Sequence, residues 1–127
     1  MSWALSWVLD SDKDVTTFQD ALTHSTSYEY GSAKELKKIT YPDNQTETFN
    51  YDNYGRLKEQ NHSAGHYRSY TYDGSGWMTY YGAVNESFDF TYNNDGTVLQ
   101  ETFGGSWKKY GYTKAGNFSK NNITISL

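Results

Sequence analysis

Two histidines four residues apart are the side chains in this sequence best spaced to bind a metal ion. His62 and His66 flank the turn residues 63–65, so the two imidazoles would face each other across a hairpin. A metal site needs a third ligand, and Glu59 or Asp73 could offer one. Because histidines beside a turn are ordinarily solvated, we predict that the pair binds no metal.

The repeated acids Asp52 and Asp73 resemble in type the carboxylate pair of a glycoside hydrolase. Each stands at the start of an Asp-x-x-Gly segment, however, so we expect it to cap the amides of a turn. Serine, histidine and aspartate all occur without a nucleophile-elbow context, and His24 lies in a polar connector. The stretch 104–106 lacks the lysine and helix of a phosphate-binding loop. We therefore predict a protein that is not an enzyme, with no catalytic residue and no cofactor.

Composition excludes several other classes of protein. The chain has 127 residues, no cysteine and a formal charge of -4, which argues against disulfide scaffolds and nucleic-acid grooves. No apolar run approaches the roughly 18 residues of a membrane helix, and the first ten residues lack the basic start of a signal peptide. Aromatic residues make up 18% of the sequence, with 13 tyrosines. We expect a folded domain whose apolar surface is built mainly from tyrosine rings.

A nine-residue pattern recurs through the chain. Its template is aromatic-x-Tyr-Asp-x-x-Gly-x-apolar, seen most clearly in FNYDNYGRL at 49–57. The opening ring recurs every 20 or 21 residues, at Trp7, Tyr28, Phe49, Tyr70, Phe90 and Tyr110. The third position holds Leu9, Tyr30, Tyr51, Tyr72, Tyr92 and Tyr112, and the last holds Val15, Leu36, Leu57, Met78, Val98 and Phe118. The turn residues between them are Asp52, Asp73, Gly55, Gly76, Gly96 and Gly116. Such regularity defines a repeat protein.

Each repeat predicts one β-hairpin. Alternating rings such as Tyr70 and Tyr72 belong on one face of a strand, and the Asp-x-x-Gly segment predicts the tight turn that follows. We therefore expect an all-β fold: an antiparallel meander of about six hairpins forming one curved single-layer sheet, in a single domain over 1–127. Two segments leave alternatives open. Residues 32–39 contain good helix formers, and residues 14–24 space their apolar side chains like a helix face or an irregular cap, although we favour strands in both.

The FNYDNYGRL segment resembles the YD repeat of Rhs-type bacterial proteins, through NYD at 50–52 and GRL at 55–57. The upstream ITYPDNQTETF at 39–49 looks like the linker of that repeat. The resemblance covers nearly the whole chain and is clearest over 39–98. It implies a role known for the family, in which long arrays coil one β-sheet into a hollow shell in Rhs and insecticidal toxins, wall-associated toxins and teneurins. Such a shell encloses a cargo polypeptide or presents a surface outside the cell.

The chain departs from that pattern in two ways. Six repeats are too few for a complete shell, and the Asp-Pro pair at which such shells cleave themselves is absent, because the single proline, Pro42, follows Tyr41. The resemblance therefore indicates a fragment of an array or a short relative. We predict a non-catalytic scaffold segment of a secreted or cell-surface bacterial protein.

An alternative function comes from a second resemblance. The stretch GGSWKKYGYTKAGNF at 104–118 looks like a cell-wall or choline-binding repeat, which uses tryptophan to build ligand cages. Only four tryptophans occur, at 3, 7, 77 and 107. The alternative is a carbohydrate-binding repeat module in which Trp77 and Trp107 form a ligand platform.

The repeated rings also predict an exposed aromatic surface. They would lie on one face of the sheet, opposite polar residues such as Glu29, Asn50, Thr71 and Thr91. Both chain ends alternate apolar side chains, at Trp3, Leu5, Trp7 and Leu9 and at Ile123, Ile125 and Leu127. Open strand edges invite pairing with another chain. We predict a homo-oligomer, or pairing with neighbouring repeats of a larger array, with a polypeptide cargo or a carbohydrate as the possible further partner.

Overall fold

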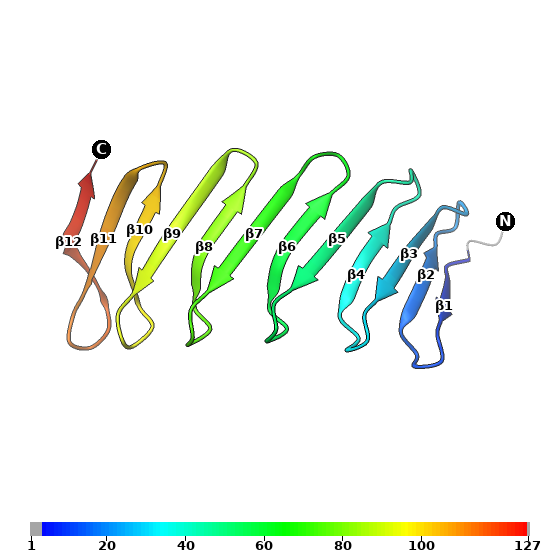
Figure 1. Ribbon diagram of the computed structural model, residues 1–127, viewed down its shortest axis with the longest axis horizontal. Coiled ribbons are helices and arrows are strands. Elements are labelled where there is room, and N and C mark those ends of the chain that lie inside the picture. Colours follow the sequence, from blue (N-terminus) through cyan, green and yellow to red (C-terminus); the bar gives the residue numbers. More distant parts are fainter. Residues whose placement is uncertain (1–3, 127) are drawn as a thin grey trace. The chain divides into compact units, whose positions relative to one another are not determined.

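The computed structural model describes residues 4–126, without the side chains of Phe118 and residues 120–126 (Figure 1). The described part consists of strands and turns, and it contains no helix that could span a membrane. Within each unit the strands follow one another in sequence order, and the pairs described below are antiparallel. The predicted all-β meander of hairpins is confirmed. The chain divides into two compact units, residues 1–67 and 68–127.

The first unit carries three hairpins. Its strands are β1 (Ser6–Leu9), β2 (Val15–Gln19), β3 (Ser25–Tyr30), β4 (Leu36–Thr40), β5 (Thr46–Tyr51) and β6 (Leu57–His62). Both segments with a competing helical pattern contain strands, β2 and β4. Phe18 of β2 pairs with Trp7, and Leu36 of β4 pairs with Tyr30. Cross-strand pairing thus overrides the local helix propensity of both segments.

The second unit carries three more hairpins and begins within β7. Its strands are β7 (Tyr67–Tyr72), β8 (Met78–Ala83), β9 (Glu86–Tyr92), β10 (Val98–Phe103), β11 (Ser106–Tyr112) and β12 (Phe118–Ser126). Within each unit the repeat turns line one end of the strands, at the bottom of Figure 1.

The repeat fixes the register of every hairpin. The third position of each copy lies directly across from its closing apolar residue, in the pairs Leu9–Val15, Tyr30–Leu36, Tyr51–Leu57, Tyr72–Met78, Tyr92–Val98 and Tyr112–Phe118. In the first five copies, the cross-strand pairing skips the residue that follows the closing apolar residue, and this residue forms a β-bulge. The bulge residues are Thr16, Lys37, Lys58, Thr79 and Leu99. Such a bulge shifts the alternation by one residue. It therefore returns Ile39 to the same face as Leu36.

Most of the turns share one geometry, and these turns lie at both ends of the strands. In nine of them within the described residues, the first residue accepts a hydrogen bond from the N–H of the fourth and donates one to the carbonyl of the fifth. The fourth residue always has a positive φ, and it is Lys13, Thr23, Lys34, Asn44, Gly55, Gly65, Gly76, Gly96 or Gly116. The template has glycine at this position because glycine adopts a positive φ without steric cost. Four turns of the first unit meet that requirement without glycine.

Candidate functional site

One face of each unit collects the aromatic side chains of the repeats, and we call it the aromatic face. Cross-strand pairs place its members on one side: Trp7, Phe18, Tyr28, Tyr30, Ile39, Phe49 and Tyr51 in the first unit, and Tyr70, Tyr72, Tyr81, Phe88, Phe90, Tyr92, Phe103, Tyr110 and Tyr112 in the second. No hydrophobic side chain among the described residues is fully buried. The aromatic face is therefore half open to solvent rather than a closed core.

The rings form a continuous stack in the second unit. Ring centroids are 5.6 Å apart for Tyr70 and Tyr81, 6.0 Å for Tyr81 and Phe88, and 4.7 Å for Phe88 and Phe103. These separations are within the range of favourable aromatic pairs. In the first unit, Trp7 and Phe18 approach to 5.5 Å. The stack gives the second unit the larger uninterrupted aromatic surface.

The tyrosine hydroxyls of the template link each repeat to the one before it. Four of them donate a hydrogen bond to the main-chain carbonyl of the preceding repeat's closing apolar residue: Tyr30 to Val15 at 3.0 Å, Tyr51 to Leu36 at 2.9 Å, Tyr92 to Met78 at 2.5 Å and Tyr112 to Val98 at 2.9 Å. Burial raises the pKa of the Tyr30 and Tyr92 hydroxyls, so both remain protonated donors at neutral pH. The sequence shows the tyrosines but gives no sign of these main-chain acceptors.

Two other tyrosines on this face bind carboxylates. Tyr41 donates to Glu47 at 2.8 Å, and Tyr110 donates to Glu101 at 2.6 Å. The bond to Glu101, together with partial burial, raises the pKa of Tyr110 to about 12, and the bond to Glu47 raises the pKa of Tyr41 in the same way. An ionised phenol beside a carboxylate would place two like charges together.

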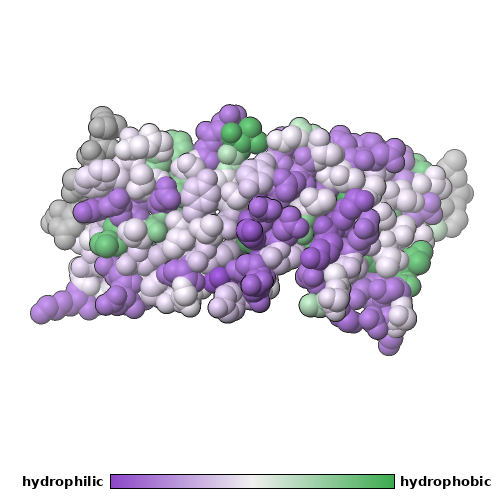
Figure 2. Space-filling model, viewed as in Figure 1, coloured by the Kyte–Doolittle hydropathy of each residue, from purple (hydrophilic) through white to green (hydrophobic). Residues whose placement is uncertain are grey.

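The opposite face is mainly polar, as the alternation predicts, although the register also places Tyr80 and Trp107 on it. Lys38 pairs with Glu29 at 3.2 Å, and Asn50 donates to Glu59 at 3.1 Å. The hydroxyls of Thr71 and Thr79 are 3.0 Å apart. On the side visible in Figure 2, hydrophobic residues form only small separate patches among hydrophilic ones.

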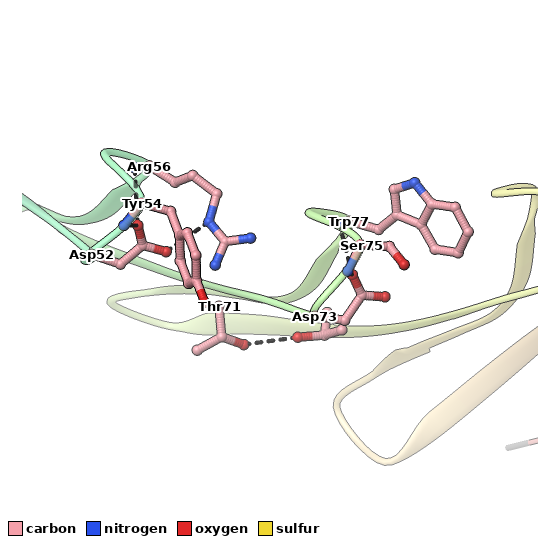
Figure 3. A network of polar contacts seen from close by, with 8 residues as sticks. Asp52, Tyr54, Arg56, Thr71, Asp73, Ser75 and Trp77 are labelled. Carbon is pink, nitrogen blue, oxygen red and sulfur yellow. Dashed lines mark hydrogen bonds and ion pairs between the residues drawn. The ribbon is translucent and has the colours of Figure 1, made fainter.

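The motif aspartates are turn caps. Oδ1 of Asp52 accepts hydrogen bonds from the N–H groups of Tyr54 and Arg56 at 2.9 and 3.0 Å, and its Oδ2 meets the Arg56 guanidinium at 2.7 Å (Figure 3). Desolvation works to raise the pKa of Asp52, but the main chain and side chain of Arg56 outweigh it and lower that pKa. Asp73 accepts the N–H groups of Ser75 and Trp77, both at 2.9 Å. Each carboxylate thus accepts main-chain N–H groups of its own turn, as the Asp-x-x-Gly spacing predicts.

The histidines lie where the sequence places them, beside turns. The rings of His62 and His66 are 5.7 Å apart, and Nδ1 of His62 accepts the N–H of Ala64 at 3.1 Å. His24 contacts Asp20 through Nδ1 at 2.9 Å. In the part of the chain that the structure describes, no three histidine or acidic side chains come together as a metal site would require.

The tryptophans of the suggested ligand platform contact the protein itself. Trp77 lies 5.4 Å from the Tyr92 ring and against Gly96, where an added Cβ would sit 3.0 Å from the indole. The ammonium of Lys109 lies 5.3 Å from the Trp107 ring. Trp3 and Leu127 lie outside the described residues, as do the side chains of Ile123 and Ile125. A platform at Trp77 and Trp107 stays a prediction.

Comparison with known proteins shows the fold. No family model matches the chain, and no curated protein sequence does. Among solved structures, a crystal structure of TcdB2-TccC3-Cdc42 matches 91% of the chain with a TM-score of 0.77 and 13% identity. The Photorhabdus luminescens Tc holotoxin pore matches the same share at 0.76 and 13%, and TcdB2-TccC3 matches 87% at 0.72 and 14%. The chain spans only 6 or 7% of those chains. It therefore has a toxin-shell-like fold over nearly its whole length.

Proposed function

We propose that this chain is a non-catalytic scaffold segment of a secreted or cell-surface protein of the YD-repeat type. In that role it would form part of a β-sheet shell that encloses a polypeptide cargo or presents a surface. The observation that carries the proposal is the link between repeats: the Tyr51 hydroxyl bonds to the carbonyl of Leu36 in the preceding copy. Each such repeat is completed by its neighbour, which suits an array in which hairpins stack in series.

The edge strand β1 fits this role. Trp7, Val8 and Leu9 are each more than half exposed, and among the strands described β1 pairs only with β2. A neighbouring hairpin of the same register would cover both the open backbone and these side chains. The likeness to TcdB2-TccC3 chains supports the same reading, since those far longer chains contain the fold as a small part.

A tandem duplication tests the proposal. The second copy is joined so that its Trp7 follows Tyr110 of the first by 20 residues, the spacing found between copies. The control is a tandem joined by a flexible Gly-Ser linker of about ten residues. The tandem with the repeat spacing should have the higher melting temperature, because only this tandem forms a new interface between repeats at the junction. Equal melting temperatures would contradict the scaffold role.

A glycan titration separates this role from the carbohydrate-binding alternative. The scaffold role predicts that tryptophan fluorescence does not change with cell-wall glycans. Saturable quenching, lost on replacing Trp77 or Trp107 with alanine, would favour a binding module instead.

A further inference from the structure

We propose that two copies of this chain pack face to face through the aromatic face of the second unit. The ring stack of Tyr70, Tyr81, Phe88 and Phe103 would then lie between two sheets as a shared core. This inference goes beyond the scaffold role, which concerns strands added along one sheet, and it does not depend on that role.

The accessible surface of the chain leaves ample area for such pairing. It amounts to 9004 Å², whereas a compact monomer of 14.6 kDa would expose about 6,900 Å². The excess is therefore about 2,100 Å² per chain. A standard stable interface buries about 800 Å² per partner. None of the hydrophobic side chains described is fully buried. Covering the aromatic face would therefore stabilise the sheet by removing this apolar surface from water.

The second unit offers the better surface for pairing. Its stack is continuous, and Phe103 at the end of the stack remains 48% exposed. In the first unit, polar side chains interrupt the aromatic face across β5 and β6: Glu47 lies opposite His62, and Phe49 lies opposite Gln60. In the second unit the corresponding row pairs Phe88 with Phe103. Apolar surface is therefore concentrated on one side of this unit.

The charges beside the stack make a second copy the fitting occupant. A hollow of about 260 Å³ lies beside the end of the stack, lined by Phe88, Glu101, Phe103, Ser106, Trp107 and Lys108. Glu101 and Lys108 are direct cross-strand partners, so an acid and a base stand side by side at its rim. A two-fold axis makes the same patch meet itself, with residue i against j and j against i. Each acid could then approach the base of the other copy, whereas a partner of a single charge sign would oppose one of the two.

The test is the mass of the full chain in solution, measured by light scattering over a concentration series, for the native chain and matched variants. The native chain should be a dimer. Phe103→Glu should weaken dimerisation about a hundredfold or more, because it removes the most exposed ring of the stack and places a charge in the interface. The matched control is Thr91→Glu on the polar face of the neighbouring strand β9, which should leave the dimer intact. A second control, Val8→Lys on the edge strand β1, should also leave it intact.

The outcomes separate the possible modes of association. Native chains that stay monomeric throughout the series would overturn the proposal, and so would a dimer that Val8→Lys abolishes and Phe103→Glu does not. Circular dichroism checks that each variant keeps its strands. If Phe103→Glu unfolds, Phe103→Ser replaces it, because Ser106 on the facing strand shows that this end of the hairpin accommodates serine. The tandem experiment remains independent, since it measures stacking along the sheet whether or not the faces pair.

Discussion

The hydroxyl of Tyr51 donates a hydrogen bond of 2.9 Å to the main-chain carbonyl oxygen of Leu36, fifteen residues earlier. Tyr51 closes β5, and Leu36 opens β4 in the preceding repeat, so the bond joins the ends of neighbouring hairpins. The same relationship recurs between Tyr30 and Val15 and between Tyr112 and Val98. Phenylalanine would supply the same ring to the aromatic face. The hydroxyl therefore explains why this template position holds tyrosine in five of six copies.

We expect Tyr51→Phe to lower the free energy of unfolding by about 1 kcal/mol, the net value of one hydrogen bond. Urea unfolding followed by circular dichroism measures the change. Tyr54→Phe is the matched control, because Tyr54 is 84% exposed at a turn and its hydroxyl loss should cost nothing measurable. Equal stability of the Tyr51→Phe variant and the native chain would show that the inter-repeat bond contributes nothing.

Thr23 should be replaceable with a gain in stability. It adopts a φ of 69°, a left-handed conformation that a β-branched residue resists. Its carbonyl accepts a hydrogen bond from the Gln19 side chain, which any residue at this position retains. Thr23→Gly should raise the free energy of unfolding by about 1 kcal/mol, and Asn44→Gly by less, because asparagine tolerates φ of 64° more readily. A larger gain for Asn44→Gly in urea unfolding would contradict the strain argument.

Two template glycines should respond differently to the same substitution. Gly55 and Gly96 have φ of 78° and 86°, so alanine at either should cost about 1 kcal/mol. An added Cβ meets nothing within 4 Å at Gly55 but lies 3.0 Å from the Trp77 ring at Gly96. Gly96→Ala should therefore destabilise the chain more than Gly55→Ala, and it should shift the tryptophan emission spectrum. Equal unfolding midpoints in urea would mean that Trp77 moves aside freely.

The turns and strands are the parts of the fold that the sequence predicts. The Asp-x-x-Gly spacing predicts the turns, the strands and their order, because each depends on residues close together in the chain. Leu36 lies where the template puts its closing apolar residue even though Lys34 replaces the glycine. The pairing register of a sheet with one aromatic face then follows from alternation.

The contacts between repeats could not be predicted in the same way. The carbonyl that Tyr51 reaches belongs to the main chain, which has no residue type to mark it. The bulge at Lys58 cannot be predicted either, because no particular residue type marks a bulge position in the sequence. The pairing of Tyr110 with Glu101 depends on the register of β10 and β11, which brings two polar groups together on a mainly aromatic face.

The phenol of Tyr110 should lose its proton at a higher pH than an ordinary tyrosine. Its bond to Glu101 and its partial burial raise its pKa to about 12, above the ordinary value of about 10 in the unfolded chain. The contribution of this pair to stability is therefore fully present below pH 10 and is lost as the pH rises from about 10 to 12. Tyrosine labelled with ¹³C at Cζ reports each phenol by NMR, and Tyr110→Phe assigns the signal. Glu101→Gln removes the neighbouring charge, so the Tyr110 titration should move down toward pH 10. A native Tyr110 that already titrates near 10, or one that Glu101→Gln leaves unmoved, would show that the 2.6 Å contact does not hold the proton on the phenol.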